Sequence, residues 1–373
     1  MAKKAYIGVD GVARKIKKGY VGVDNVARKV KKGYIGVGGV ARCFFSSGEL
    51  AYYGNTTNLD VSRYHMAATT VGDYALFGGG YTTNSAHFRL DIYNTNLTHD
   101  YISLDTSRYQ FTATTVGNYA LLGGGRGSSG YTGIVEAIDT SLTHTTPTSL
   151  SSPRGMLVAT TVGNYALFAG GYRGSVSKVV DAYDASLTRT TATSLSVARE
   201  DLAATTVANY ALFGGGYTGS ACSNVVDEYS TNLTRTTGTN LSLARRYIAA
   251  TTVGDYALFG GGYTTIAGTN SYSGVVDAYY TNLARSTPAS FNISKGNHAA
   301  TTVGDYALFG GGFNGSAIGD VEVYDTNLTH STAPVSFIAR YFLSATTVGN
   351  YALFAGGHDG SNARRDVTVY TVD

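Results

Sequence analysis

Aromatic and hydrogen-bonding side chains recur at regular intervals along this sequence, in short polar segments that precede a small, β-branched stretch. They carry phenol, imidazole, carboxylate, guanidinium and amide groups, and they are Tyr64, His65, Tyr109, Gln110, Glu200, Asp201, Arg246, Tyr247, Asn297, His298 and Tyr341. Aromatic faces combined with hydrogen-bonding groups suit the binding of a sugar or a protein epitope. These residues are therefore our candidate ligand-binding residues.

Catalytic chemistry is a weaker interpretation of the same residues. Glu200 and Asp201 are adjacent on one loop, and such carboxylates are more often solvated than paired for acid–base work. The "GGGY" runs do not match GxGxxG, and no helix follows them to bind a phosphate. Cys43 and Cys222 have neither disulfide nor metal-ligand spacing. We therefore expect no catalytic residue, no metal site and no cofactor.

An internal repeat must position the candidate residues. The string "TTVG" or "TTVA" begins at Thr69, Thr114, Thr160, Thr205, Thr251, Thr301 and Thr346, in steps of 45, 46, 45, 46, 50 and 45 residues. The repeated unit has four predicted strands: "MAATT", "YALFGGG" after a Gly-Asp or Gly-Asn turn, "VVDAY" after a variable loop, and "RTTATSLS" after a polar turn. Four antiparallel strands every ~45 residues are typical of a propeller blade. The sequence therefore predicts an all-β, seven-bladed propeller.

Three histidines occupy one equivalent position in this repeat. His99, His144 and His330 follow Leu-Thr in a turn where other copies have Arg. We expect these side chains to be polar groups that face solvent.

The repeat resembles the kelch family over residues from about 49 to 373. The matching features are the glycine pair that ends the second strand, as in Gly78-Gly79, the "VxxY" third strand, and the Arg before the next repeat. Kelch blades usually carry a Trp in the fourth strand, whereas this sequence has Thr there and no Trp. The resemblance implies a kelch-like propeller that serves as a binding platform. A copper enzyme of the galactose-oxidase branch would need clustered His and Tyr ligands and a Cys–Tyr crosslink, so it is the third alternative.

The two ends of the repeat region predict how the ring closes. The last copy stops after its third strand, "DVTVYTVD", whereas residues 49–63 match a fourth strand without a preceding blade. We expect this N-terminal segment to complete the C-terminal blade and close the ring without a covalent link.

The loops differ sharply between the two ends of the predicted propeller. The first-to-second and third-to-fourth turns are nearly uniform, whereas the loops at the other end differ in every copy. Divergent loops on a rigid scaffold are a common place for recognition. We therefore predict that the variable end, which carries the candidate residues, is the binding face.

Residues 1–48 form a chemically distinct segment. Residues 1–42 contain 11 Lys and Arg against two Asp, a net charge of +9, whereas residues 43–373 have a net charge of −6. A motif of 14 residues, "YIGVDGVARKIKKG", occurs three times, and its DG, DN and GG dipeptides favour two-residue hairpin turns. We predict a basic arm of β-hairpins that binds a protein partner rather than nucleic acid, with contacts from Tyr6, Arg14, Lys15, Tyr20, Arg28, Lys29, Tyr34 and Arg42.

This arm resembles short repeats at the N-termini of virion and tail-associated proteins of phages of Gram-positive bacteria. The resemblance implies a non-enzymatic structural protein, with the arm docked to other virion proteins and the propeller rim binding a host surface glycan or protein. Oligomerisation through the arm is a further expectation. The alternative is a bacterial kelch-type scaffold for protein–protein interactions. With no signal peptide or apolar stretch of ~18 residues, we expect assembly in the host cytoplasm, location on the virion and no membrane contact.

Overall fold

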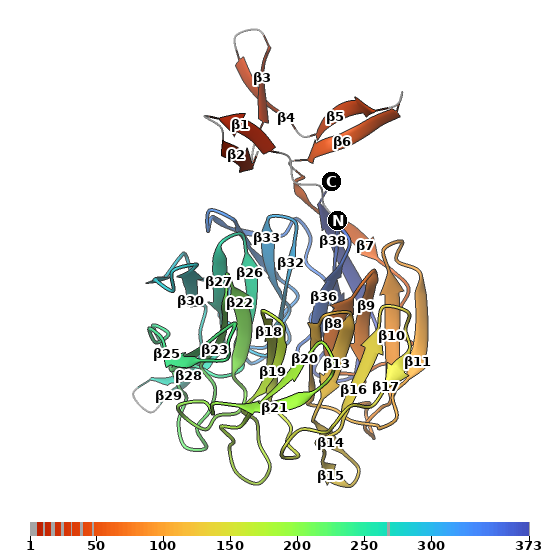
Figure 1. Ribbon diagram of the computed structural model, residues 1–373, viewed down its shortest axis with the longest axis vertical. Coiled ribbons are helices and arrows are strands. Elements are labelled where there is room, and N and C mark those ends of the chain that lie inside the picture. The colour runs from red at the N-terminus through yellow and green to blue at the C-terminus, as the bar shows by residue number, and fades with distance from the viewer. Residues whose placement is uncertain are drawn as a thin grey trace.

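Seven four-stranded antiparallel sheets stand as blades around a central axis (Figure 1). This computed structural model describes residues 48–265 and 269–372 in full, and the backbone alone of Ile266 and of the strands between residues 6 and 46. The described residues contain no helix, and therefore none that could cross a membrane. The predicted all-β, seven-bladed propeller is confirmed.

Blades 1 to 4 follow one another along the chain. The first strands of neighbouring blades contact each other and together surround the central channel. Their strands are β8 (Ala67–Val71), β9 (Tyr74–Gly78), β10 (Arg89–Asn94) and β11 (His99–Ser103) in blade 1; β12 (Thr112–Val116), β13 (Tyr119–Gly123), β16 (Val135–Asp139) and β17 (His144–Thr145) in blade 2; β18 (Val158–Val162), β19 (Tyr165–Ala169), β20 (Val180–Asp184) and β21 (Arg189–Ala192) in blade 3; and β22 (Ala203–Val207), β23 (Tyr210–Gly214), β24 (Val226–Ser230) and β25 (Arg235–Thr237) in blade 4.

Blades 5 to 7 repeat this order, and two loops carry small hairpins of their own. The strands are β26 (Ala249–Val253), β27 (Tyr256–Gly260), β30 (Val276–Tyr280) and β31 (Arg285–Ser286) in blade 5; β32 (Ala299–Val303), β33 (Tyr306–Gly310), β34 (Val321–Asp325) and β35 (His330–Thr332) in blade 6; and β36 (Ser344–Val348), β37 (Tyr351–Ala355) and β38 (Val367–Val372) in blade 7. The loop hairpins are β14 (Arg126–Gly127) with β15 (Gly130–Tyr131), and β28 (Tyr263–Ile266) with β29 (Thr269–Tyr272).

An N-terminal strand closes the ring, as the sequence predicts. β7 (Leu50–Asn55) is the fourth strand of blade 7 and pairs antiparallel with β38, from Asn55 opposite Thr368 to Leu50 opposite Val372. Leu50 lies at the end that carries the uniform turns, where the Gly304 turn of blade 6 lies beside Val372. Because β7 runs from this end toward the variable loops, the N-terminal arm joins the propeller opposite the variable face.

Three separate two-stranded sheets precede the propeller. They are β1 (Tyr6–Val9) with β2 (Val12–Lys15), β3 (Gly19–Val23) with β4 (Val26–Val30), and β5 (Lys32–Val37) with β6 (Val40–Ser46). The predicted hairpin arm is thus confirmed at the level of the backbone. The side chains of the predicted attachment residues lie outside the described part of the structure.

Hydrophobic layers between adjacent blades form the core. The second strand is the most buried: in β9, Ala75, Leu76 and Phe77 are at most 1 % exposed. Phe77 and Tyr93 pack edge to face, with ring centroids 6.0 Å apart, in the layer between blades 7 and 1. The Tyr93 hydroxyl then donates a hydrogen bond of 2.8 Å to the carbonyl of Thr57, in the segment that follows the outer strand of blade 7. The third-strand tyrosine of the repeat thus joins two blades.

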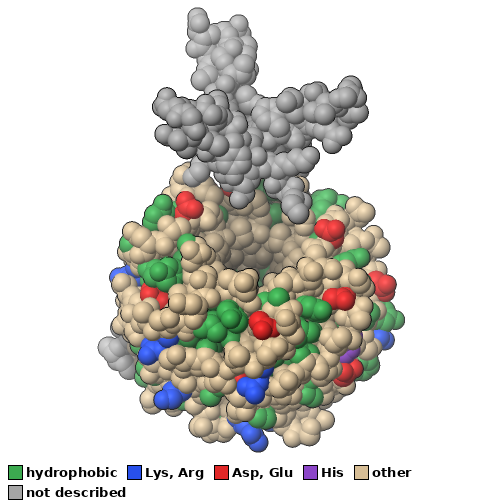
Figure 2. Space-filling view, viewed as in Figure 1, with side chains coloured by type: hydrophobic (Ala, Val, Ile, Leu, Met, Phe, Trp, Pro, Cys, Tyr) green, Lys and Arg blue, Asp and Glu red, His purple; other side chains and the backbone are tan. Residues whose placement is uncertain are grey.

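The paired threonines of the first strands line the channel. The Thr252 hydroxyl donates to the carbonyl of Thr206 in the preceding blade, at 2.6 Å, and lies 2.8 Å from the Thr205 hydroxyl. The corresponding hydroxyl-to-carbonyl bond forms at six of the seven blade interfaces among the described residues. These bonds satisfy carbonyls on the inner edge of each sheet, which lacks a neighbouring strand. The ring surrounds a hollow whose visible lining is uncharged (Figure 2).

A buried cation links each blade to the next. In the segment before blade 3, Arg154 donates to the Gly170 carbonyl at 2.8 Å and forms an ion pair of 2.8 Å with Asp181, while the Arg154 carbonyl accepts from Gly125 of blade 2. The equivalent cations, all at most 1 % exposed, are Arg63, Arg108, Arg154, Arg199, Arg245, Lys295 and Arg340. Each therefore bonds through its side chain to one blade and through its carbonyl to the blade before it.

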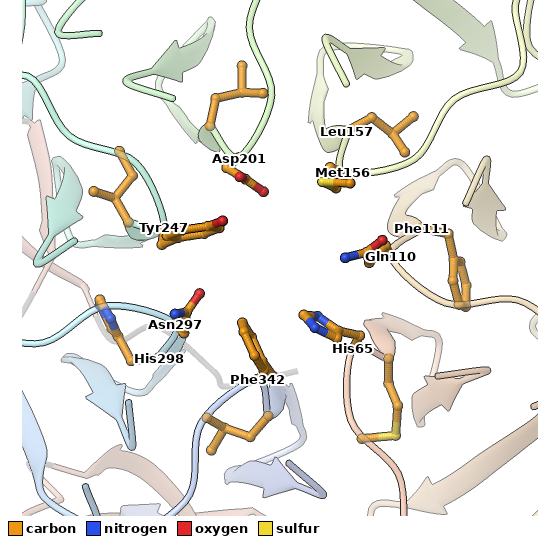
Figure 3. A pocket seen from close by; sticks show the side chains of 14 residues that line it. His65, Gln110, Phe111, Met156, Leu157, Asp201, Tyr247, Asn297, His298 and Phe342 are labelled. Atoms are coloured by element: carbon orange, nitrogen blue, oxygen red, sulfur yellow. The ribbon is translucent and has the colours of Figure 1, made fainter. Parts of the chain in front are cut away.

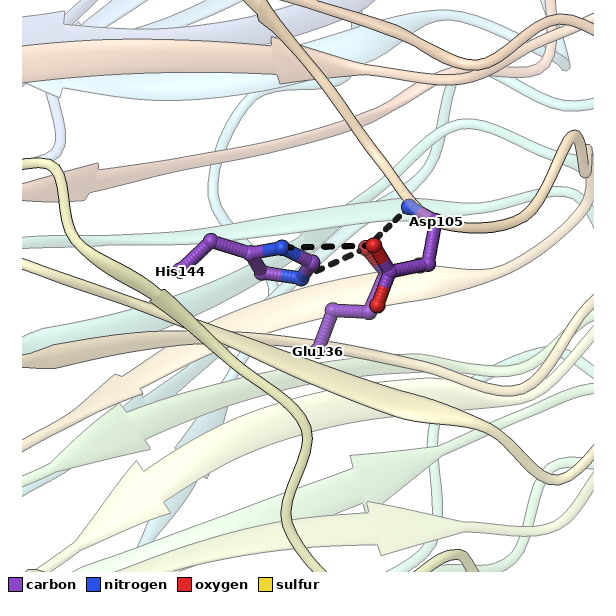
Figure 4. A group of neighbouring side chains, drawn as sticks. All are labelled: Asp105, Glu136 and His144. Atoms are coloured by element: carbon purple, nitrogen blue, oxygen red, sulfur yellow. Dashed lines mark hydrogen bonds and ion pairs between the residues drawn. The ribbon is translucent and has the colours of Figure 1, made fainter.

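A second basic side chain, on the outer strand, contacts the third-strand carboxylate in blades 1 to 6, and it is a histidine in blades 1, 2 and 6 and an arginine in blades 3 to 5. Arg189 lies 3.0 Å from Asp181, and in blade 2 His144 lies 2.9 Å from Glu136 and 3.5 Å from Asp105 (Figure 4). The prediction that the Leu-Thr-His histidines face solvent is therefore wrong. The His99 side chain is only 12 % exposed and lies 2.7 Å from one carboxylate oxygen of Asp91, whose other oxygen pairs with the buried Arg63.

Truncation tests the closure of the ring. Removal of residues 1–42 leaves β7 intact and should leave the melting temperature of the propeller unchanged. Removal of residues 1–63 also deletes β7 and Arg63, so it exposes the edge of β38 and should lower the melting temperature and promote aggregation. Thermal unfolding with light scattering measures both effects, and equal melting temperatures would contradict the closure.

Substitution of one buried arginine tests the link between blades. Arg199→Ala leaves the Asp227 carboxylate buried beside one fewer cation and should lower the free energy of unfolding by about 3–5 kcal/mol. Arg199→Lys should cost less, because blade 6 holds Lys295 at the equivalent position. Urea unfolding of both variants measures the difference. Equal losses would show that the charge, which lysine retains, is not what the site requires.

Candidate functional site

One residue from each blade points toward the axis at the variable end of the channel (Figure 3). We call these seven residues the inner ring: His65, Gln110, Met156, Asp201, Tyr247, Asn297 and Phe342. Each follows the segment that carries the buried cation and precedes the first strand of its blade. The mouth that they surround has a cavity volume of about 300 Å³.

A closed cycle of backbone hydrogen bonds holds the inner ring. Each amide donates to the carbonyl of the ring residue in the preceding blade, from Gln110 to His65, and so on around to His65, which donates to Phe342 at 3.0 Å. All seven bonds are between 2.9 and 3.3 Å. All seven residues have φ between 52° and 55°, a left-handed conformation that is unfavourable for side chains such as Tyr, Phe and Met. The ring of bonds stabilises this backbone and aims the side chains at the axis.

The floor of the mouth is apolar except in blade 6. It consists of the residues that follow the inner ring, which are Met66, Phe111, Leu157, Leu202, Ile248, His298 and Leu343. His298 is 7 % exposed, and its only polar neighbour with a bearing on the imidazole pKa, apart from the nearby cations, is the Gly260 backbone among the described residues. Burial and the nearby Lys295 lower the pKa of His298 well below its usual value, so the imidazole is neutral.

Asp201 is the only carboxylate in the inner ring. Burial is the largest cause that raises the pKa of Asp201 to about 7, and Glu200 adds to the rise. The Tyr247 hydroxyl forms a hydrogen bond with this carboxylate, and Arg246 acts in the same direction by lowering the pKa. The group therefore gains or loses a proton near neutral pH, in a mouth whose other inner-ring residues carry no negative charge.

An aromatic face lies beside His65. The His65 imidazole and the Phe342 ring have centroids 3.9 Å apart. Burial lowers the pKa of His65 to about 4, so this tilted pair is a neutral aromatic surface at physiological pH. In Figure 3 the pair lies across the mouth from Asp201.

A second, wider ring surrounds the mouth. Tyr64, Tyr109, Glu200, Arg246 and Tyr341, each one residue before the inner ring, form isolated β-bridges with the residue that follows the glycine run of their blade. Their partners are mostly aromatic: Tyr81, Arg126, Tyr217, Tyr263 and His358.

These side chains form a continuous aromatic arc over much of the rim. Successive ring centroids lie 4.8 to 6.0 Å apart through Tyr263, Tyr272, Phe313, Tyr341, His358, Tyr64, Tyr81 and Tyr109. Arg246 extends the arc, because its guanidinium lies 5.3 Å from the Tyr263 ring centroid and 4.5 Å from that of Tyr217. All of these rings are partly exposed.

The structure separates the predicted binding residues into three positions. The inner ring contains His65, Gln110, Asp201, Tyr247 and Asn297, whereas the wider ring contains Tyr64, Tyr109, Glu200, Arg246 and Tyr341. His298 lies in the floor, because the blade 6 loop places Gly296 and Asn297 at the two ring positions. Met156, Phe342 and the aromatic residues after the glycine runs were missed, although the recurrent "GGGY" pattern marks the latter.

Asp105, Glu136 and His144 lie close together, but we interpret them as part of the charged contact between buried cation, carboxylate and outer basic residue that recurs in the blades, rather than as a metal centre (Figure 4). Arg108 already lies 2.9 Å from the second Glu136 oxygen, and its positive charge opposes a metal ion at this point. The equivalent outer cation in blades 3 to 5 is an arginine, which cannot ligate a metal.

No protein-family model and no curated protein matches this chain. The arrangement of its sheets defines the chain as a seven-bladed β-propeller, with the two rings of side chains at one end of its channel.

Replacement of Asp201 tests the buried acid. Its folded-state pKa is raised, so its contribution to stability is full at low pH and is lost as pH rises from about 4 through 7. Asp201→Asn removes this cost while retaining a residue type that tolerates the left-handed backbone, as Asn297 does in blade 6. At pH 8 the variant should be more stable than the native protein by about 1–3 kcal/mol, with the gain vanishing toward pH 4. Urea unfolding at several pH values measures this, and a gain independent of pH would contradict it.

Proposed function

We propose that this protein is a non-enzymatic, virion-associated binding protein. In this proposal its N-terminal arm docks to other virion proteins, and its variable propeller rim binds a glycan on the host surface. The kelch-like repeat pattern and the resemblance of the arm to phage tail-associated repeats support the two halves of the proposal.

The observation that carries the proposal is the aromatic arc on the face opposite the arm. Sugar rings stack on exposed aromatic faces, and the polar groups of the inner ring supply hydrogen bonds to hydroxyls. The chain enters the propeller at Leu50, at the uniform end, whereas Tyr64 and Tyr341 lie at the variable end. A particle-bound arm would therefore leave the arc facing outward.

Adsorption and glycan-array measurements test this proposal. Tyr64→Ala combined with Tyr341→Ala interrupts the arc and should reduce binding of the full-length protein to host cells and to arrayed glycans by about tenfold or more. Tyr280→Ala is the matched control, because Tyr280 is 39 % exposed but lies at the uniform end, opposite Tyr256.

The outcomes separate the alternatives. Binding to a protein on host cells with a blank glycan array would favour the scaffold function, and undiminished adsorption of the double variant would move the site away from the arc. Absence of the protein from purified virions by mass spectrometry would contradict the virion location.

A further inference from the structure

The geometry points to a specific ligand chemistry at the mouth: we propose that it binds an ammonium group carried by the glycan, with Asp201 as the counter-ion. This inference rests on the proposed function only in taking the ligand to be a sugar. The ligand class would be an amino sugar or a sugar with an amine substituent.

The charge of the inner ring is the first argument. Of its seven side chains, only Asp201 is acidic and none carries a fixed positive charge. The ring residues that flank Asp201 around the cycle, Met156 and Tyr247, leave it without an opposing cation inside the mouth. A ligand cation is therefore the group that this carboxylate lacks.

The aromatic faces are the second argument. The Tyr247 ring lies next to the carboxylate, and the His65–Phe342 pair, whose rings are tilted by 34° to each other, lies across the mouth (Figure 3). An ammonium group between a carboxylate and aromatic rings is stabilised by its ion pair and by cation–π attraction. Gln110 and Asn297 supply neutral donors and acceptors for hydroxyl groups on the same ligand.

The surrounding charges leave this position open. Arg246 is the nearest cation, but its guanidinium is held 4.5 to 5.3 Å from the centroids of the Tyr217, Tyr247 and Tyr263 rings, outside the inner ring. Glu200 opposes Arg246 on the same side and raises the pKa of Asp201. The other titratable groups at the mouth, His65, Tyr247 and His298, are uncharged at neutral pH.

Binding should therefore be coupled to a proton. Near and below pH 7 the Asp201 carboxyl carries a proton that must leave before the ammonium group can pair with it. Affinity for a ligand whose amine stays protonated should rise as pH increases from 5.5 to 8.

The test uses two probes with the same sugar, of which one carries an ammonium group and the other a neutral acetamide in its place. These are 2-aminoethyl β-glucoside, whose alkylamine remains protonated throughout this pH range, and its N-acetylated derivative. NMR titration of the full-length protein at pH 8 should give an affinity for the amine about tenfold higher than for the acetamide. Asp201→Asn should abolish this preference and its pH dependence, whereas the control Asp73→Asn, in an exposed turn at the other end of the channel, should retain both.

Each outcome has a defined meaning. Equal affinities for the two probes, or a preference that survives in Asp201→Asn, would overturn the ammonium site. If those results accompany glycan binding that depends on Tyr64 and Tyr341, the proposed function stands without it. Amine-selective binding combined with a blank array and unchanged adsorption would support the ammonium site while contradicting the host-glycan function.

Discussion

The buried cation between successive blades is the interaction on which the rest of the structure depends. A guanidinium such as that of Arg154 satisfies carbonyls at the end of the second strand and a carboxylate on the third strand, in a place that water does not reach. Its own carbonyl simultaneously accepts from the blade before it. Removal of either the cation or the carboxylate would leave the other as an unpaired buried charge. The angle between blades is therefore restricted to one that preserves these bonds.

The same segment shapes the binding face. The two residues that follow each buried cation form the β-bridge of the wider ring and the left-handed residue of the inner ring, so Arg199 leads directly to Glu200 and Asp201. Left-handed backbone is costly for a residue such as Tyr247, and it persists here because the amide and carbonyl are both bonded within the closed cycle. The mouth is therefore preorganised by the ring itself, and its chemistry can vary from blade to blade without altering the backbone.

Much of the fold could be predicted because equivalent positions of the repeat make the same contacts in successive blades. The Thr pairs and the glycine run each have one role in every blade, and the third-strand tyrosine has one in every blade except blade 2, which has Ile138 there. Their spacing therefore predicts seven sheets and a shared fourth strand in blade 7. The site could be predicted only in part, since strand patterns do not show which loop residue turns inward. His298 illustrates this: Gly296 takes the β-bridge position and Asn297 the position in the closed cycle, so His298 lies one residue further on, in the floor. The outer histidines were misjudged for a related reason, because their partner carboxylates lie eight residues away across a hairpin.

Blade 7 shows how the general rule adapts at the closure. Its third strand carries Thr368 where blades 1 to 6 have a carboxylate, and Thr368 bonds both to Arg340 and to Asn55 of β7. In the other blades the outer cation arrives on a strand of the same continuous segment, whereas here the outer strand comes from the far end of the chain. A neutral hydrogen-bonded pair takes the place of the carboxylate, so the buried Arg340 guanidinium bonds to the Thr368 hydroxyl and the Phe354 carbonyl instead of to an acid. The closure thus relies on β-pairing and on Arg63, which follows β7 and bonds into blade 1, so the N-terminal segment both completes the last blade and attaches it to the first.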